Sequence, residues 1–315
     1  MNDIENILKS KFNELNTKKS TMEVYINSFK RIIRDVFNNE LPNMSTINDD
    51  INIKQIMDYI YSDKVTMSSK KTILNGLINC FIVLEIDLSK LKKEFKKVIR
   101  ITSNERVYTK PSETELKHKK SLKYIIMKRD LYKNLLKADF QKVDIHYVLL
   151  CLYTYLPPLR GEDYYNSLLL YDSNVLTQIE RKEKNYLCLK EKLLVINKYK
   201  TVDIYGIRII SIPNELIEIL NNFKKKSDSQ WIICTIKGNK LGHENFYKLM
   251  TEAFGEKISS SMMRKIYISS EIIDGNMTAE ERKKLSYIMG HSVEQQQLTY
   301  SKFSEKLHPN ENIVK

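Results

Sequence analysis

Apolar residues recur every three or four positions through much of the first hundred residues, which is the spacing of amphipathic helices. A Ser-x-x-Glu pattern that resembles a capping box opens the clearest of these segments at Ser20. The segments with helical spacing cover residues 20–37, 53–61, 68–84 and 88–101. The pattern predicts a small all-helical N-terminal domain over residues 1–105.

The helical spacing lapses after residue 101 and returns at residue 122. The stretch between is rich in Thr, Ser, Glu and Lys and contains Pro111, a composition typical of linkers. We therefore expect a linker at residues 106–121 and a second domain at residues 122–315.

The second domain mixes two kinds of pattern. Helical spacing covers residues 122–136 and 143–155, where a Pro-Pro pair follows, and it returns after His243. Short β-branched runs between polar turns predict strands at residues 186–189, 193–197 and 205–212, with residues 231–235 as a further candidate. The predicted fold class is mainly α with a small antiparallel β-sheet (α+β).

The charge balance narrows the class of partner. The 315 residues include 52 Lys and Arg against 39 Asp and Glu, a formal net charge of +13. This excess favours a polyanion, either nucleic acid or an acidic membrane face, although it also serves plain solubility. Both halves of the chain are basic, which excludes a single cationic tail on a neutral protein.

Two predicted helices of the first domain carry basic side chains beside their apolar stripes. Such a face suits a phosphate backbone, and it equally describes an ordinary solvated helix. The candidate DNA-binding residues are Lys30, Arg31, Arg34, Lys92, Lys93, Lys96 and Lys97.

The cysteines and the apolar runs favour a protein that works inside a cell. Cys80, Cys151, Cys188 and Cys234 are isolated in apolar runs, which suggests neither a disulfide framework nor a metal site. No stretch approaches the ~18 apolar residues of a membrane span, and the polar start MNDIENILKS does not resemble a signal peptide. We expect an intracellular protein with no membrane partner.

Five residues suited to phosphate chemistry stand in order along the second domain. They are Arg160 in LPPLRGEDY, Lys200 between two predicted strands, Arg264 in SSSMMRKIY, His291 in MGHS and, nine residues later, Tyr300. Each alone has an ordinary explanation, because the chain holds 19 tyrosines and a lysine in a turn is usually just solvated. Their joint order is the sharper signal.

In this order the residues resemble the tyrosine recombinase (phage integrase) family, in which a Gly-His-Ser turn opens a helix that leads to a nucleophilic tyrosine. The resemblance implies that Tyr300 is the nucleophile and that Arg160, Arg264, Lys200 and His291 are catalytic. It covers the second domain well. The first domain resembles the family's core-binding domain only in outline, and the two would form a C-shaped clamp around DNA.

The residue types suit the implied chemistry. Two guanidiniums can hold the non-bridging oxygens of a phosphodiester by paired hydrogen bonds, and a phosphotyrosyl ester conserves the bond energy for rejoining. A lysine can protonate the departing 5′ oxygen. Lys200 is the preferred donor, and Lys198, two residues away, is the alternative that the sequence leaves open.

Two further positions are compared with the family pattern. Asp163 lies three residues after Arg160, where the family commonly has an acidic residue, and it would orient that arginine. Ser261 lies three residues before Arg264, where the family often has histidine. A serine can hydrogen-bond a phosphate but cannot act as a base near neutral pH. The base for Tyr300 would then be His291 or water.

The resemblance implies a site-specific recombinase or integrase that forms a 3′-phosphotyrosyl intermediate on double-stranded DNA, without metal, ATP or another cofactor. It implies a homodimer on each site and a homotetramer at synapsis, with Phe303 and Leu307 anchoring the C-terminal segment on a neighbouring protomer. In its segment LPPLRGEDY and its Asn-rich composition, the chain resembles the integrases of protist-infecting viruses, virophages and related mobile elements. A viral protein would act in the host nucleus or cytoplasm, which the sequence leaves open.

Two other functions stay open. A type IB topoisomerase shares the active-site chemistry but acts as a monomer that relaxes supercoils. A noncatalytic DNA-binding protein derived from a recombinase is compatible with Ser261. The sequence contains no GxxxxGK[ST] phosphate loop and no clustered carboxylates, so it predicts neither an ATPase nor a two-metal nuclease.

Overall fold

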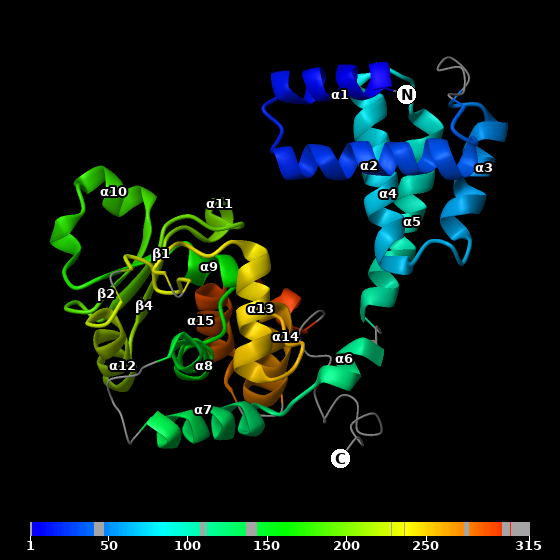
Figure 1. The fold of residues 1–315 in the computed structure, drawn as a ribbon. Coiled ribbons are helices and arrows are strands. Elements are labelled where there is room, and N and C mark those ends of the chain that lie inside the picture. Colours follow the sequence, from blue (N-terminus) through cyan, green and yellow to red (C-terminus); the bar gives the residue numbers. More distant parts are fainter. Residues whose placement is uncertain are drawn as a thin grey trace. The chain divides into compact units, whose positions relative to one another are not determined.

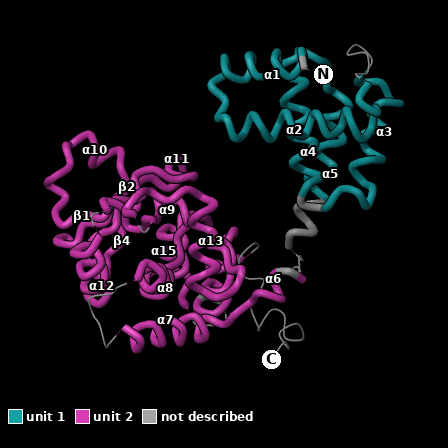
Figure 2. The backbone as a smooth tube through the Cα atoms, viewed as in Figure 1, with its two compact units in different colours: residues 1–109 teal, residues 110–315 magenta. Residues whose placement is uncertain are grey.

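The chain divides into two compact units, residues 1–109 and residues 110–315 (Figure 2). A computed structural model describes residues 2–40, 47–107, 111, 113–136, 144–227, 229–235, 237–273, 277–297 and 303 (Figure 1). The segment expected as a linker, residues 106–121, contains a short helix, α6 (Glu113–His118).

The first unit is helical throughout its described residues. Its helices are α1 (Asn2–Glu14), α2 (Lys19–Val36), α3 (Asp50–Tyr61), α4 (Met67–Val83) and α5 (Ser89–Val107). Helix α2 packs along α4, and their facing apolar side chains, such as Phe29 and Phe81 with ring centroids 5.9 Å apart, form the core. Helix α2 begins at Lys19 without a side-chain cap, so the expected capping box at Ser20 is not formed.

The second unit contains the sheet and the remaining helices. In chain order it comprises α6, α7 (Leu122–Leu136), α8 (Ile145–Tyr155), α9 (Gly161–Tyr165), β1 (Ser167–Leu170), the 3₁₀ turn η1 (Ser173–Val175), α10 (Gln178–Glu183), β2 (Asn185–Cys188), β3 (Leu193–Ile196), α11 (Val202–Tyr205), β4 (Arg208–Ser211), α12 (Asn214–Lys224), α13 (His243–Phe254), α14 (Ser260–Tyr267), the π-helical turn η2 (Ile268–Ile273), α15 (Ala279–Met289) and α16 (Val293–Gln295).

Helix α8 is the centre of the second unit. Every residue from Tyr147 to Tyr153 is buried, because the helix is apolar on all sides and is packed against α7, α12 and α13 (Figure 1). The chain leaves α8 through the Pro157-Pro158 pair, which cannot continue a helix. The segment that follows is therefore held on a rigid base.

The fold class is mainly α with one small sheet, as the sequence predicts, but the sheet is mixed rather than antiparallel. Its strand order is β1-β2-β3-β4, in which β1 pairs with β2 in parallel and the other pairs are antiparallel. The parallel pair arises because η1 and α10 carry the chain back to the start of the sheet. Residues 231–235 do not form a strand, since they make only isolated bridges, Trp231 to Leu168 and Cys234 to Lys240.

The described residues were expected to contain no disulfide, metal site or membrane-spanning helix, and the structure places the relevant side chains and helices as follows. Cys80, Cys151, Cys188 and Cys234 are all buried free thiols. Across the described ranges, no group of three or more His, Cys, Asp or Glu side chains is placed to hold a metal ion. None of the described helices has the length and apolar character to traverse a bilayer.

Candidate active site

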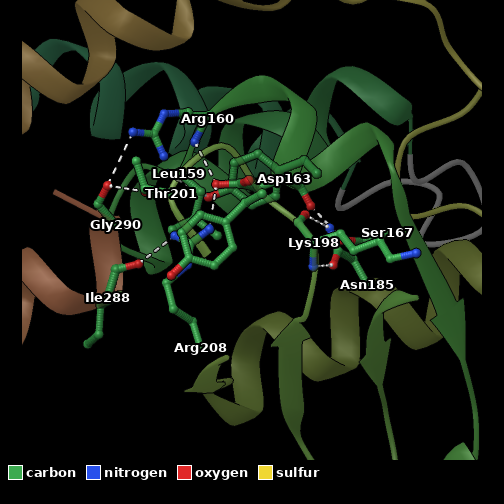
Figure 3. Close-up of polar contacts among 12 residues, drawn as sticks. Leu159, Arg160, Asp163, Ser167, Asn185, Lys198, Thr201, Arg208, Ile288 and Gly290 are labelled. Atoms are coloured by element: carbon green, nitrogen blue, oxygen red, sulfur yellow. Dashed lines mark hydrogen bonds and ion pairs between the residues drawn. The ribbon is translucent and has the colours of Figure 1, made fainter. Parts of the chain in front are cut away.

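Arg160 occupies the junction between the Pro-Pro segment and helix α9. Its backbone is extended and caps α9, and its amide donates to Asp163 Oδ2 at 3.3 Å. Its side chain is partly buried, and Nη2 donates to the Gly290 carbonyl at 3.2 Å (Figure 3). Among the described residues Nη1 is buried without a hydrogen-bond partner, so this arginine keeps an unused donor.

Gly290 ends helix α15 in the left-handed conformation, with φ +66°. A Cβ at this position would lie 3.2 Å from Arg208 Nη1 and 3.3 Å from Arg160 Nη1, so a side chain there would crowd both arginines in addition to straining the backbone. Its carbonyl accepts from Arg160 and also from Thr201 Oγ1 at 3.1 Å (Figure 3). The turn before His291 is thus bonded to two distant segments.

Arg264 lies in the middle of α14 and is 1% exposed. Its Nη1 donates to the Pro158 carbonyl at 3.0 Å, two residues before Arg160. Helix α14 begins at a Ser259 N-cap whose Oγ accepts from the Met262 amide. A backbone carbonyl therefore orients Arg264 toward the segment that carries Arg160.

The two arginines line one cavity of about 400 Å³. This volume lies in the usual range for ligand sites. The other lining residues supply hydroxyls and aromatic rings, together with one carboxylate and one imidazole. They are Gly161, Glu162, Tyr165, His243, Phe246, Tyr247, Met250, Ser259, Ser260 and Ser261.

His291 follows the Gly290 turn and is 4% exposed. Burial is the largest cause, and the charges of Arg264 and Arg160 add to it, in lowering the pKa of His291 to about 3. The imidazole is therefore neutral near pH 7. The shift also shows that the two arginines create a positive potential at this histidine, which favours an anion nearby.

Asp163 is buried and contacts both Arg160 and a further arginine, Arg208. Its Oδ2 accepts from the Arg160 amide and from Arg208 Nη2, the latter at 3.0 Å. Arg208 is fully buried at the start of β4 and donates through Nη1 to the Ile288 carbonyl at 2.8 Å (Figure 3). Its guanidinium also lies over the Tyr199 ring, 3.7 Å from the ring centre. Sequence reasoning did not identify Arg208.

The two candidate lysines of the turn after β3 have different surroundings. Lys198 is exposed, lies 4.0 Å from Glu183 and lines a separate cavity with Asn185, so its side chain extends away from Arg160 (Figure 3). Lys200 is also exposed and directly precedes Thr201, which bonds to Gly290. The backbone beside Lys200 is thus part of the cluster, and the Lys198 side chain is not.

Ser261 is exposed at the rim of the cavity that holds both arginines. Tyr300 and Leu307 lie outside the described residues. Phe303 is described and is buried in the core of its own unit, where its amide donates to Ser269 Oγ at 3.1 Å and its ring lies 5.4 Å from Lys119 Nζ. Phe303 thus packs within its own unit, and its docking on a neighbouring protomer stays a prediction.

No protein-family model matches the chain, and no curated protein sequence matches it.

The comparison with solved structures finds a similarity to XerA recombinase. The aligned region has 13% sequence identity and a TM-score of 0.39, and it covers 97% of this chain and 95% of that chain. At this identity and TM-score the likeness says nothing about function. A functional conclusion has to come from the residues of the site.

The basic residues expected to bind DNA in the first unit fall into two groups. On α2, Lys30 Nζ lies 2.7 Å from Glu5, Arg34 Nε lies 2.6 Å from Asp35, and Arg31 lies 3.7 Å from Asp35. These cations already have carboxylate partners, so they are poorer phosphate ligands than the sequence suggests.

On α5 the lysines point into solvent. Lys92, Lys93, Lys96 and Lys97 are exposed, and Lys97 pairs with Glu94 at 2.6 Å. For the other three, the structure records no ion pair with any residue that it describes. This group is the better candidate for contact with a polyanion.

Proposed function

We propose that this protein cleaves and rejoins double-stranded DNA as a site-specific recombinase or integrase, through a 3′-phosphotyrosyl intermediate on Tyr300 and without ATP or metal. The observation that carries the proposal is the shared cavity of Arg160 and Arg264. Both guanidiniums are oriented by carbonyl groups, and both lower the pKa of the adjacent His291. Such a pair is suited to the charge that develops on a reacting phosphate.

The proposed reaction divides the work among named groups. The phenol oxygen of Tyr300 attacks phosphorus, the bond from phosphorus to the 5′ oxygen breaks, and Lys200 gives that oxygen a proton. Arg160 and Arg264 hydrogen-bond the non-bridging oxygens throughout. Rejoining is the same sequence in reverse, with the 5′ hydroxyl as the attacking group.

We assign His291 the role of a neutral hydrogen-bond donor to a phosphoryl oxygen, and the burial that lowers its pKa supports this role. A base with a pKa of about 3 removes a phenol proton poorly. Ser261 supplies no base at the position where the resemblance leads one to expect histidine. We therefore assign the proton of Tyr300 to water that enters the open cavity.

The proposal extends to assembly and source. The protein would bind DNA as a homodimer on each site and pair two sites in a homotetramer, with both units clamping the duplex. More narrowly, we propose that the protein is one of the integrases of protist-infecting viruses, virophages and related mobile elements. It would then act inside the host cell. The segment LPPLRGEDY and the Asn-rich composition support it.

A covalent-trapping experiment tests the central step. The purified protein is incubated with a pool of end-labelled nicked duplexes whose sequence is randomised around the nick, then denatured, and the DNA that stays joined to protein is measured. We expect an adduct with wild type and none with Tyr300→Phe. If wild type gives no adduct, or if Tyr300→Phe gives as much, the proposed reaction is wrong.

The same preparation separates the rival functions. Duplexes recovered from the adduct supply a preferred site for a strand-transfer assay between two DNA molecules. Transfer supports the recombinase, and relaxation of a supercoiled circle without transfer supports a type IB topoisomerase. Salt-sensitive DNA binding without any adduct supports the noncatalytic DNA-binding protein, for which the exposed Ser261 is the favouring observation.

A further inference from the structure

Arg208 is an arginine with no exposed surface that contacts three separate segments of the second unit. Nη2 lies 3.0 Å from Asp163 in α9, and Nη1 donates to the carbonyl of Ile288 near the end of α15. Its guanidinium carbon lies 3.7 Å from the centre of the Tyr199 ring, in the turn between β3 and α11. One planar group therefore joins a helix start, a helix end and a hairpin turn.

Burying this charged group contributes little to the stability of the fold. Taking a guanidinium and a carboxylate out of water is expensive, and a buried ion pair adds little net stability compared with apolar side chains of similar size. What the guanidinium adds is direction, because its donors and its flat face are fixed relative to one another. Arg208 therefore sets the relative positions of its three partners more than it stabilises the fold.

Each contact of Arg208 lies within three residues of Arg160, His291 or Lys200, which take part in the proposed reaction. Asp163 also accepts from the Arg160 amide. Ile288 lies two residues before Gly290, whose carbonyl accepts from Arg160. Tyr199 directly precedes Lys200.

We propose that Arg208 is a positioning residue that holds the Lys200 turn in register with Arg160 and the His291 turn, so that the Lys200 amine reaches the departing 5′ oxygen. The inference rests on the proposed function and specifies how its proton donor is placed. Arg208 itself touches no DNA, because its side chain is fully buried.

A second arginine of the same unit provides a matched control. Arg129 in α7 lies 2.8 Å from Asp130 and stacks on the Tyr155 ring at 4.4 Å. It has the same kinds of partner, a carboxylate and a tyrosine face, but it contacts none of the residues of the proposed reaction. Arg129 is partly buried, with 14% of its side chain exposed, so it controls for the loss of an arginine that pairs with a carboxylate and a tyrosine ring outside the site.

The experiment compares two leaving groups at the scissile phosphate. One duplex carries the natural 5′ oxygen and the other a 5′ sulfur at the same position, in a site recovered by covalent trapping. A thiol ionises at a pKa of about 8.5, far below the value of about 15.7 for water. Sulfur therefore leaves with the electron pair of the broken bond and needs no proton donor, whereas oxygen needs one.

The variants separate positioning from folding. Arg208→Lys keeps the charge but loses the flat fork, and Tyr199→Leu removes the stacking partner. The double variant Asp163→Asn/Arg208→Gln removes both charges together, so that neither remains buried and unpaired. Arg129→Lys is the control, and thermal melting shows which variants are folded.

We expect Arg208→Lys to slow adduct formation about 100-fold on the oxygen substrate, the scale of a displacement near 1 Å, and to react with the sulfur substrate at nearly the wild-type rate. Lys200→Met should show the same pattern, the other two test variants a weaker form of it, and Arg129→Lys neither effect.

Two kinds of failure are distinguishable. If the folded Arg208 and Tyr199 variants lose the same factor on both substrates, or behave like Arg129→Lys, the positioning role is overturned while the proposed function stands. If wild type forms no adduct on either substrate, the proposed function itself fails.

Discussion

The cations of helix α2 and the arginines of the candidate active site are held by different kinds of partner. On α2, Lys30 and Arg34 lie within 2.7 Å of carboxylates, those of Glu5 and Asp35. In the second unit, Arg160 and Arg264 donate to backbone carbonyls. Both regions are basic in sequence, but the recorded partners of their cations differ, carboxylates on α2 and backbone carbonyls in the second unit.

The pKa values of Glu5 and His291 differ from their usual values for different reasons in the two regions. Hydrogen bonds from Lys30 and Lys9 lower the pKa of Glu5 to about 2, so both of these lysines are paired with a carboxylate. Burial, together with the charges of Arg264 and Arg160, lowers the pKa of His291 to about 3, so positive potential persists at the site. A carbonyl fixes the direction of a guanidinium and leaves its charge in place. Counting basic residues therefore does not locate an anion site.

The largest expected effect comes from removing either arginine of the candidate active site. We expect Arg160→Ala and Arg264→Ala each to slow adduct formation by about 10³-fold, because each removes donors aimed at the charge of the reacting phosphate. Arg34→Ala on α2 should leave the rate unchanged. Single-turnover trapping measures all three, with thermal melting to verify folding. An Arg34 defect as large as that of Arg160 would erase the distinction between the regions.

The next effect concerns the two lysines of one turn. Lys200→Met should slow adduct formation by about 10²-fold, the usual lower range for loss of a general acid. Lys198→Met should be nearly silent, since its side chain lies beside Glu183 and in a separate cavity. The two rates are measured on the same trapped duplex. The reverse order would show that Lys198 is the proton donor.

A smaller effect separates α5 from α2 within the first unit. The triple variant Lys92→Gln/Lys93→Gln/Lys96→Gln should lower the slope of log affinity against log salt by up to about 0.9 for each DNA phosphate that the variant no longer neutralises. The matched triple variant of Lys30, Arg31 and Arg34 should change the slope little, because those cations are already paired. Salt titrations of DNA binding provide both slopes, and a flatter slope for the α2 variant alone would contradict this ranking.

The smallest effect is on stability against pH. The pKa of His291 is about 3 in the folded protein and near 6.5 in an unfolded chain. Between these values the unfolded chain takes up a proton that the folded protein refuses. Stability should therefore fall as the pH drops below about 6.5, by up to about 1.4 kcal/mol per pH unit.

His291→Gln should remove that part of the slope, as measured by denaturant unfolding at several pH values between 4 and 7. His146 is the control, because hydrogen bonds to Asp144 and Glu252 raise its pKa and its contribution is lost as the pH rises instead. Equal slopes for wild type and His291→Gln would mean that the histidine is not held neutral by burial and the two arginines.

Much of the fold could be predicted from periodicity. Residues 122–136 were expected to be helical and form α7, because their apolar spacing is local information. Strand β1 was missed, since a four-residue run such as SLLL after a short helix has no period that distinguishes strand from helix. Its parallel pairing, which makes the sheet mixed, depends on a crossover that no local pattern reveals.

The missed residue of the site has a similar explanation. Alternation along Ile207-Arg208-Ile209 places the arginine opposite two isoleucines, and hydrophobicity alone would put the isoleucines inside. The structure instead buries Arg208 and leaves Ile207 and Ile209 48% and 59% exposed. The cause is Asp163, a partner 45 residues earlier in the chain. A tertiary pair of this kind cannot be read from the sequence around either member.

Mapping the point of attachment tests the central claim most directly. Trypsin should release residues 285–302, a peptide that contains Tyr287 and Tyr300, from the trapped adduct after nuclease digestion. Fragmentation in a mass spectrometer then locates the residual nucleotide. The account predicts that it is on Tyr300 in wild type, that the modified peptide is absent in Tyr300→Phe, and that it forms about 10³-fold more slowly in Arg160→Ala. Attachment to Tyr287 or to any other residue would contradict it.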